Sequence, residues 1–335
     1  MGHGGDGLHA RGFSVLGMRI RLDSNNYELL SDDEYFQGKG AQLHSLLSNF
    51  GRLDELPDEG EFDLRVSLVD DPRYPPMLYR ECTGAYSITG SLVDCERAAI
   101  DKRASVFGNM GLFSKLLVRE LEFRGIYSIH STSFYERARN RLYVVMGGSG
   151  SGKSTVLLNA LSVGGIEVFG TELTHFSFGN GATRMLKGSL WQNCRMGNLM
   201  FDFPWLMERF GLKPPTGDPW HSYRSIPLLE QQVPEEHLDD ASIVLVMPRI
   251  EGERHTSIRR GLLPGSLRFP LFQNLSDKVT PPTLLWGKHF IPSVDTPDRQ
   301  TARMEAATRF IEEAPIVECW DVLSSPNDCL TGIFP

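Results

Sequence analysis

The run Gly147–Thr155 constrains the fold of this 335-residue chain more than any other feature. Its sequence, GGSGSGKST, satisfies the pattern G-x-x-x-x-G-K-[ST] in full. The apolar run Leu142–Met146 precedes it, and Val156–Val163 follows with helical apolar spacing. A short apolar strand, Ile166–Phe169, comes next. This order of strand, glycine-rich turn, helix and strand predicts a βαβ unit within an α/β fold.

Each residue type in the motif suits the binding of phosphate groups. Glycines let successive backbone N–H groups turn inward, and a helix that starts near Lys153 points its positive end at an anion. Lys153 is expected to reach the β- and γ-phosphates of ATP, and Ser154 to give a hydroxyl ligand to Mg²⁺. The predicted nucleotide-binding residues are Gly147, Gly148, Ser149, Gly150, Ser151, Gly152, Lys153, Ser154 and Thr155. The alternative is a flexible turn between a strand and a helix.

A phosphate loop alone does not name a reaction, so the catalytic carboxylate has to be found elsewhere. The chain contains neither an LSGGQ nor an N-K-x-D signature, and the second buried strand, Ala241–Met247, ends without an acidic residue. Glu172 follows the strand Ile166–Phe169, whose carboxyl end is expected to open onto the same edge of the sheet as the loop. Glu172 is therefore predicted to bind Mg²⁺ or to accept a proton. The alternative is an exposed glutamate at a strand end.

The segment from Ile129 to Glu172 resembles the HPr serine kinase family and its phosphoenolpyruvate-carboxykinase-like P-loop relatives. The shared features are IHSTSF at Ile129–Phe134, a hairpin into LYVVM, the phosphate loop, and a helix that ends at Gly-Gly before a short strand. In that family a histidine lies in the strand before the hairpin, and His130 matches it. The family carries two aspartates where this chain has Gly170-Thr171-Glu172, so Glu172 replaces one carboxylate and the other has no counterpart there.

The resemblance implies an enzyme, a P-loop kinase that transfers phosphate from Mg²⁺·ATP to a hydroxyl group of a small molecule or a peptide serine. In this interpretation Lys153, Glu172 and His130 are catalytic, and Ser154 and Glu172 hold the metal. Two alternatives stay open. One is a regulatory or scaffold protein that binds nucleotide without catalysis, and the other is an ATPase that couples hydrolysis to conformational change.

Composition limits the partners and the compartment. Hydrophobic residues make up 41% and charged residues 23%, which is typical of a globular chain with a core. A net charge of −8 argues against nucleic acid, and the apolar runs are too short for a membrane span. Five scattered cysteines without C-x-x-C spacing favour a reducing cytoplasm. A homo-oligomer stays open.

Three regions are expected along the chain. Residues 1–12 are predicted to be a flexible tail, 13–125 a smaller α/β domain, and 126–335 the P-loop kinase-like domain. In the smaller domain, Phe13–Leu22 is expected to form one strand, and Asn109–Arg124 a helix that ends before Gly125.

Two basic segments are further candidates for contacts with phosphate or substrate. One is the loop Arg249–Arg254, followed by Arg259 and Arg260, and the other carries Arg184 and Lys187. For each, the alternative is a solvated charged surface. His175 is predicted to be a surface or core histidine without a role in the site. The acidic cluster Glu235–Asp240 is expected to face water.

Overall fold

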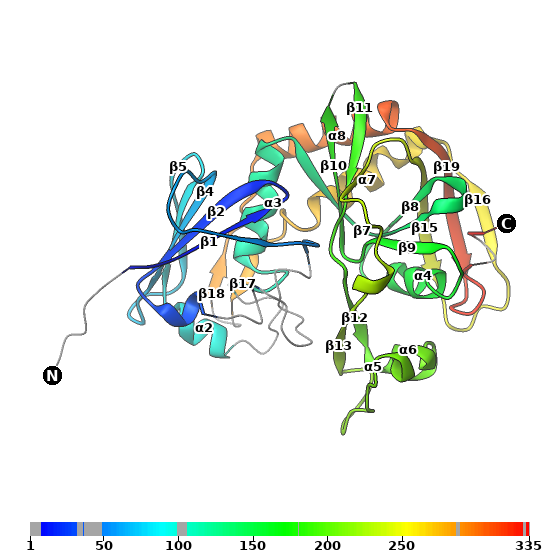
Figure 1. Ribbon diagram of the computed structural model, residues 1–335, viewed down its shortest axis with the longest axis horizontal. Coiled ribbons are helices and arrows are strands. Elements are labelled where there is room, and N and C mark those ends of the chain that lie inside the picture. Colours follow the sequence, from blue (N-terminus) through cyan, green and yellow to red (C-terminus); the bar gives the residue numbers. More distant parts are fainter. Residues whose placement is uncertain are drawn as a thin grey trace. The chain divides into compact units, whose positions relative to one another are not determined.

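The computed structural model describes residues 8–31, 36, 49–98, 106–179, 181–285, 289–330 and 333–334 (Figure 1). They form a mixed α/β protein with a six-strand mixed sheet and a larger nine-strand mixed sheet. The chain divides into two compact units, of which one holds Met1–Phe123 and Val279–Val294 and the other holds Arg124–Lys278 and Asp295–Pro335. No helix within the described ranges combines the length and the apolar character needed to span a bilayer.

The first unit is built on the six-strand sheet, in the order β3-β1-β2-β4-β6-β5. Apolar residues alternate with polar ones along β2 and β4, so one face of the sheet is buried. Its elements are β1 (His9–Val15), β2 (Met18–Ser24), β3 (Asp54–Leu56), β4 (Leu64–Asp70), β5 (Met77–Cys82), β6 (Ala85–Gly90), α2 (Leu92–Ala98), α3 (Leu112–Phe123), β17 (Thr283–Leu285) and β18 (His289–Ile291).

The single strand expected over Phe13–Leu22 is wrong, because this segment turns back on itself. Val15 pairs with Met18, and the two residues between them, Leu16 and Gly17, have φ angles of 49° and 80°. Two successive positive φ angles form a tight hairpin turn whose twist matches that of the strands. The flexible tail expected over residues 1–12 is wrong in part as well, since β1 begins at His9; residues 1–7 lie outside the described ranges.

The domain boundary expected near residue 125 lies close to the division between the two units after Phe123. The second region, however, is not continuous in sequence. The segment Val279–Val294 clusters with the first unit, although it was expected within 126–335. The ammonium group of Lys115 on α3 donates to the carbonyl oxygens of Pro281 (2.6 Å) and Pro282 (3.3 Å). This long-range pairing ties the segment to the first unit, and no local pattern signals it.

The second unit contains the nine-strand sheet, in the order β14-β11-β10-β7-β8-β15-β19-β16, with β9 paired to β7. Its elements are β7 (Ile126–Glu136), β8 (Arg141–Met146), α4 (Lys153–Ala160), β9 (Ile166–Gly170), β10 (Leu173–Gly179), β11 (Ala182–Leu186), β12 (Trp191–Arg195), α5 (Met196–Phe201), α6 (Pro204–Arg209), β13 (Tyr223–Pro227), β14 (His237–Leu238), β15 (Ser242–Ile250), β16 (Ile258–Gly261), α7 (Arg268–Ser276), α8 (Pro297–Glu313) and β19 (Ile316–Ser324). Strands β12 and β13 form a separate two-strand sheet.

Helices cover both faces of the nine-strand sheet (Figure 1). Tyr143 and Val145 of β8 belong to the core that includes α4, whereas Leu142, Val144 and Met146 belong to the core with α7 and α8. Successive side chains of a strand point to opposite faces, so both faces are apolar and the strand reads as a continuous apolar run. The strand predicted from LYVVM is therefore confirmed as a central, fully buried one.

The direction of the strands decides where the candidate site lies. Strand β7 runs antiparallel to both β8 and β9, so β8 and β9 point the same way. Their carboxyl ends therefore open at one edge, although β7 lies between them rather than the two strands being neighbours. At that edge Ser131 pairs with Met146, and its N–H donates to the Glu172 carbonyl oxygen at 3.3 Å.

A buried ion pair fixes the place where the chain leaves and re-enters the second unit. The side chains of Arg303 on α8 and Asp295 are 0% and 1% exposed, and Nη2 of Arg303 lies 2.7 Å from Oδ1 of Asp295. Arg303 Nη1 also donates to Ser276 Oγ at 3.0 Å. Ser276 precedes the departing segment and Asp295 follows it, so one guanidinium group holds both ends.

Replacing Arg303 with methionine is expected to lower the free energy of unfolding by about 3–5 kcal/mol, because Asp295 would be left buried and unpaired. The matched control is Arg184→Met, which breaks a half-exposed pair with Asp239 and is expected to cost less than about 1 kcal/mol. Urea unfolding of the full-length chain measures both changes. Equal effects of the two substitutions would contradict a clamping role for Arg303.

Candidate functional site

The glycine-rich run lies where its sequence context predicts, between the end of β8 and the start of α4. Gly147, Gly150 and Gly152 have φ angles of 150°, 81° and 98°. These conformations are costly for any residue with a Cβ atom, which accounts for glycine at these places. The strand, loop and helix context expected for a phosphate loop is confirmed.

Two elements, β15 and α7, contact the loop from outside. The Ile250 N–H at the end of β15 donates to the Ser151 carbonyl oxygen at 3.1 Å. A Cβ atom on Gly152 would lie only 2.2 Å from Cγ1 of Ile250, so the loop and β15 approach as closely as glycine permits. On the other side, the Gly147 N–H donates to Asn274 Oδ1 of α7 at 3.1 Å. The loop conformation is therefore set by packing as well as by its own glycines.

Lys153 arches back over the loop that precedes it. Its Nζ donates to the carbonyl oxygens of Gly147 (2.7 Å) and Gly148 (3.1 Å), and the residue is 9% exposed. Burial lowers the pKa of Lys153, while the negative charges of Glu172 and Asp277 act in the opposite direction. The Lys153 ammonium group is therefore held within the loop by backbone carbonyl oxygens.

Ser154, in the first turn of α4, accepts a hydrogen bond from Gln192 Nε2 of β12 at 3.0 Å. The same amide nitrogen donates to the Asn193 carbonyl oxygen, which fixes the orientation of the amide. Oε1 of Gln192 and Oγ of Ser151 are both buried without a hydrogen-bond partner within the described ranges. Both groups can still pair with a polar ligand at the loop. No motif in the sequence singled out Gln192.

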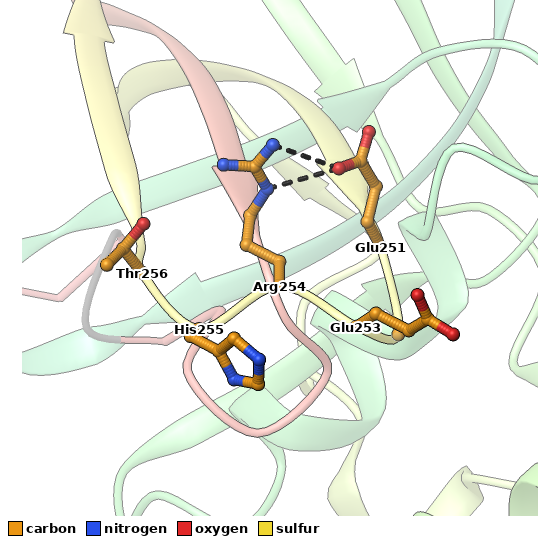
Figure 2. Close-up of a pocket in the computed structure, with 6 residues that line it drawn as sticks. Glu251, Glu253, Arg254, His255 and Thr256 are labelled. Carbon is orange, nitrogen blue, oxygen red and sulfur yellow. Dashed lines mark hydrogen bonds and ion pairs between the residues drawn. The ribbon is translucent and has the colours of Figure 1, made fainter.

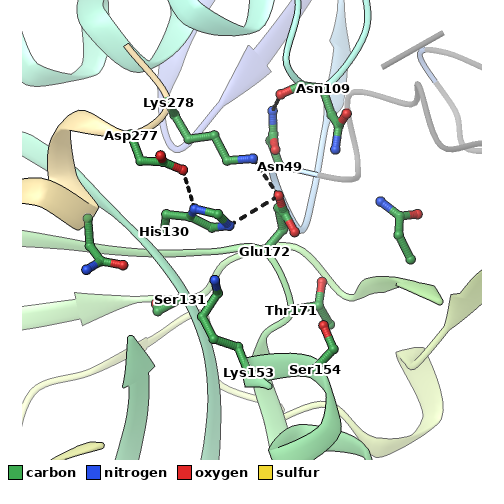
Figure 3. Close-up of polar contacts among 12 residues, drawn as sticks. Asn49, Asn109, His130, Ser131, Lys153, Ser154, Thr171, Glu172, Asp277 and Lys278 are labelled. Carbon is green, nitrogen blue, oxygen red and sulfur yellow. Dashed lines mark hydrogen bonds and ion pairs between the residues drawn. The ribbon is translucent and has the colours of Figure 1, made fainter. Parts of the chain in front are cut away.

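Glu172 lies in the turn between β9 and β10, at the edge where the loop begins. Its Oε1 is 2.5 Å from Lys278 Nζ and 3.6 Å from His130 Nε2, and its side chain is 24% exposed (Figure 3). Burial would raise the pKa of Glu172, but the charges of Lys278, His130 and Lys153 outweigh it and lower the pKa to about 2. Glu172 is therefore firmly ionised.

His130 on β7 lies between two carboxylates (Figure 3). Its Nδ1 is hydrogen-bonded to Asp277 Oδ2, and its Nε2 faces Glu172. Burial lowers the pKa of His130, and Lys278 lowers it further, against the opposing effects of Asp277 and Glu172. The carboxylate at Nδ1 favours the tautomer with the proton on Nδ1, which leaves the Nε2 lone pair available.

Asp277 and Lys278, which directly follow α7, complete the cluster, and sequence reasoning missed both. They are separated in sequence from His130 and Glu172 by 147 and 106 residues, respectively. The hydrogen bond from His130 and the charges of Lys278 and Lys153 lower the pKa of Asp277. The cluster thus holds a second carboxylate, Asp277. It follows α7, whereas the family's second aspartate would lie beside Glu172 at the end of β9. An acidic and a basic residue after a helix are too common a pattern to single out.

The cluster balances its own charge. Lys153 rises from the start of α4 towards His130, and Lys278 approaches Glu172 from the other side (Figure 3). Two lysines therefore face two ionised carboxylates, with a histidine between them. Within the described ranges, no group of three or more His, Cys, Asp and Glu side chains is arranged to hold a metal ion. A Mg²⁺ ion at Ser154 and Glu172 would have to take most of its ligands from phosphate and water.

The loop that follows β15 forms an open pocket of about 570 Å³ (Figure 2). Arg254 donates from Nε (3.1 Å) and Nη2 (3.0 Å) to Glu251 Oε2. Arg249 pairs with the other oxygen of Glu251 at 3.1 Å. Arg249 and Arg254, two of the basic residues proposed for this segment, are therefore held by one glutamate. The pocket is lined by Glu251, Gly252, Glu253, Arg254, His255 and Thr256.

The other candidate residues have local partners. Arg184 pairs with Asp239 at 2.8 Å, and Lys187 lies 3.3 Å from Glu236, so part of the acidic cluster expected to face water neutralises both. His175 is fully buried and its Nδ1 is 2.8 Å from Ser128 Oγ, which places it in the core. These residues are accounted for by structural roles.

In comparisons with known proteins, no family model matches the chain, and no curated protein matches it. The site is therefore interpreted from its own geometry.

The glycines of the loop provide a graded test of its conformation. Gly148→Ala is expected to change the free energy of unfolding by less than about 1 kcal/mol, because there is open space around its Cβ position. Gly150→Ala has the same open space but a φ of 81°, so it should cost about 1–2 kcal/mol. Gly152→Ala combines a positive φ with a steric clash against Ile250, so it should lower the free energy of unfolding most. Thermal unfolding of the three variants measures the order, and any other order would contradict this geometry.

Acid titration tests the environment of Glu172. Its pKa is lowered from 4.5 to about 2 in the folded protein, so its ionised form stabilises the fold above about pH 4.5. This contribution is lost as the pH falls from about 4.5 towards 2. Glu172→Gln should therefore lower the unfolding free energy at neutral pH. The difference in unfolding free energy between wild type and variant should become smaller as the pH falls from about 4.5 towards 2.

Urea unfolding at a series of pH values measures that difference. Glu253→Gln, at an exposed glutamate of the loop after β15, controls for the general loss of a negative charge. A difference for Glu172→Gln that stays constant or grows on acidification would contradict the assigned environment.

Proposed function

We propose that this chain is a P-loop phosphotransferase of the HPr kinase-like type. It moves the γ-phosphoryl group of Mg²⁺·ATP to a hydroxyl group of a small molecule or a peptide serine. The observation that carries this proposal is the convergence of two independent features at one edge of the nine-strand sheet. The phosphate loop leaves β8 there, and Ser131, which pairs with Met146 of β8, donates to the backbone of Glu172.

The residues at the loop fit a nucleotide with Mg²⁺. Ser151 Oγ and Gln192 Oε1 lack partners within the described ranges, and there is open space around the Cβ positions of Gly148 and Gly150. Lys153 would bind the β- and γ-phosphates, and Ser154 and Glu172 would hold the metal ion. When bound, Mg²⁺ neutralises charge on the phosphates and supports departure of ADP.

The charge states divide the catalytic roles between Glu172 and His130. A carboxylate with a pKa of about 2 is a good metal ligand and a weak base at neutral pH. His130, oriented by Asp277, presents the Nε2 lone pair towards the same space and takes the acceptor proton. The acceptor oxygen then forms a bond to the γ-phosphorus, the bond to the β,γ-bridging oxygen breaks, and ADP leaves.

The pocket beside the loop is suited to the nucleoside end of ATP. Ile250, the residue before the first lining residue Glu251, donates to Ser151 of the phosphate loop, and Glu253, His255 and Thr256 line the pocket with polar groups. A carboxylate and a hydroxyl can pair with ribose hydroxyl groups, and the histidine ring can stack on a base.

One observation favours a second candidate, a regulatory protein that binds nucleotide without catalysis. Lys278 occupies Oε1 of Glu172, so the carboxylate is satisfied without a metal ion. On this alternative, the wild type binds nucleotide without phosphoryl transfer or hydrolysis. The two candidates therefore differ in turnover.

Calorimetric titration and a turnover assay test the proposal together. The wild type is expected to bind ATP with Mg²⁺, and Lys153→Ala to weaken binding by about tenfold or more, because it removes a charge aimed at the phosphates. Glu172→Gln keeps size and hydrogen bonding but should reduce phosphoryl transfer, or slow ATP hydrolysis without an acceptor, by about a hundredfold. Its nucleotide affinity should change much less.

Arg184→Ala serves as the control for loss of a basic side chain held elsewhere by Asp239. No nucleotide binding by the wild type at millimolar concentration would end the proposal. If the wild type hydrolyses ATP and Glu172→Gln does so at the same rate, Glu172 has no role in the mechanism.

A further inference from the structure

Lys278 is a buried cation in the candidate site that the roles assigned above do not use. Its side chain is 7% exposed, and its Nζ lies 2.5 Å from Glu172 Oε1. A lysine is rarely buried this far unless its charge has a partner or a ligand to meet. Its charge also lowers the pKa of both His130 and Lys153, so it acts on the same space as the loop lysine.

The backbone that carries Lys278 is anchored independently of Glu172. Ser276, two residues earlier, accepts from the fully buried Arg303, which also pairs with Asp295. Asp277, the preceding residue, is hydrogen-bonded to His130. Lys278 therefore stays at the edge of the sheet when Glu172 changes its partner, and only its flexible side chain has to turn.

We propose that Lys278 is a second phosphate-binding lysine, which leaves Glu172 and contacts the γ-phosphoryl group when Mg²⁺·ATP binds. This inference rests on the proposed function. The exchange preserves charge pairing, because Glu172 gains the metal ion and Lys278 gains a phosphate oxygen. Lys153 and Lys278 then hold the transferring group from two elements, the start of α4 and the end of α7, and share the charge that develops on it.

A comparison of ATP with ADP isolates this contact, since ADP lacks the γ-phosphoryl group. Lys278→Met keeps most of the side-chain length without the charge. It is expected to weaken Mg²⁺·ATP binding by about tenfold while Mg²⁺·ADP binding changes by less than about twofold. Lys278→Arg should retain most of the preference for ATP. Calorimetric titration of the full-length chain measures all of these affinities.

A purely structural role for Lys278 makes a different prediction. If it only neutralises Glu172, Lys278→Met should have no effect on ATP affinity in a Glu172→Gln background. If it binds the γ-phosphoryl group, the loss of preference for ATP over ADP should persist there. Thermal unfolding of each variant confirms that the compared proteins are folded, and Lys278→Arg provides the charge-preserving comparison if Lys278→Met is unstable.

The outcomes separate this inference from the proposed function. Wild-type protein that binds neither ATP nor ADP would overturn both. Wild-type protein that binds both nucleotides, with equal weakening of ATP and ADP in the Lys278 variants or with none, would overturn the role of Lys278 alone. A selective loss of ATP affinity that persists without the Glu172 charge would support it.

Discussion

The antiparallel course of β7 between β8 and β9 is the constraint on which the candidate site depends. It makes β8 and β9 point the same way, so the phosphate loop and Glu172 emerge at one edge of the sheet. Backbone pairing at Ser131 then holds both ends in register. Because β8 is buried on both faces, this register cannot shift without moving apolar residues out of two cores.

Charge balance is the second organising feature of the site. Lys153 and Lys278 face Glu172 and Asp277, and His130 lies between the carboxylates. Lys153 donates to two carbonyl oxygens of the loop, and Lys278 pairs with the Glu172 carboxylate. On the proposed function, the site would change partners without leaving a charge buried and unpaired, which is the state that costs most in a protein interior. The buried Arg303 pairs with Asp295 and donates to Ser276, which anchors the backbone next to Asp277 and Lys278.

The sequence predicted the features that local residue patterns determine. It did not predict the features that depend on contacts between distant segments. The spacing of glycine, lysine and serine, between an apolar strand and an apolar helix, predicted the loop and its neighbours. The turn at Leu16–Gly17 was missed because a leucine there adopts a positive φ, which its residue type does not suggest. Asp277, Lys278 and Gln192 were missed because they reach the site through pairings between distant parts of the chain. The excursion of Val279–Val294 into the first unit has no local signal for the same reason.

A crystal structure of the full-length chain with Mg²⁺ and a non-hydrolysable ATP analogue tests the central claim most directly. The claim is that the phosphate loop and the cluster around Glu172 form one site for phosphoryl transfer. We expect the terminal phosphate to contact Lys153, with Glu172 released from Lys278 and turned to the metal ion. Nucleotide at the loop with Glu172 still paired to Lys278 and remote from the metal ion, or no nucleotide at the loop, would contradict it.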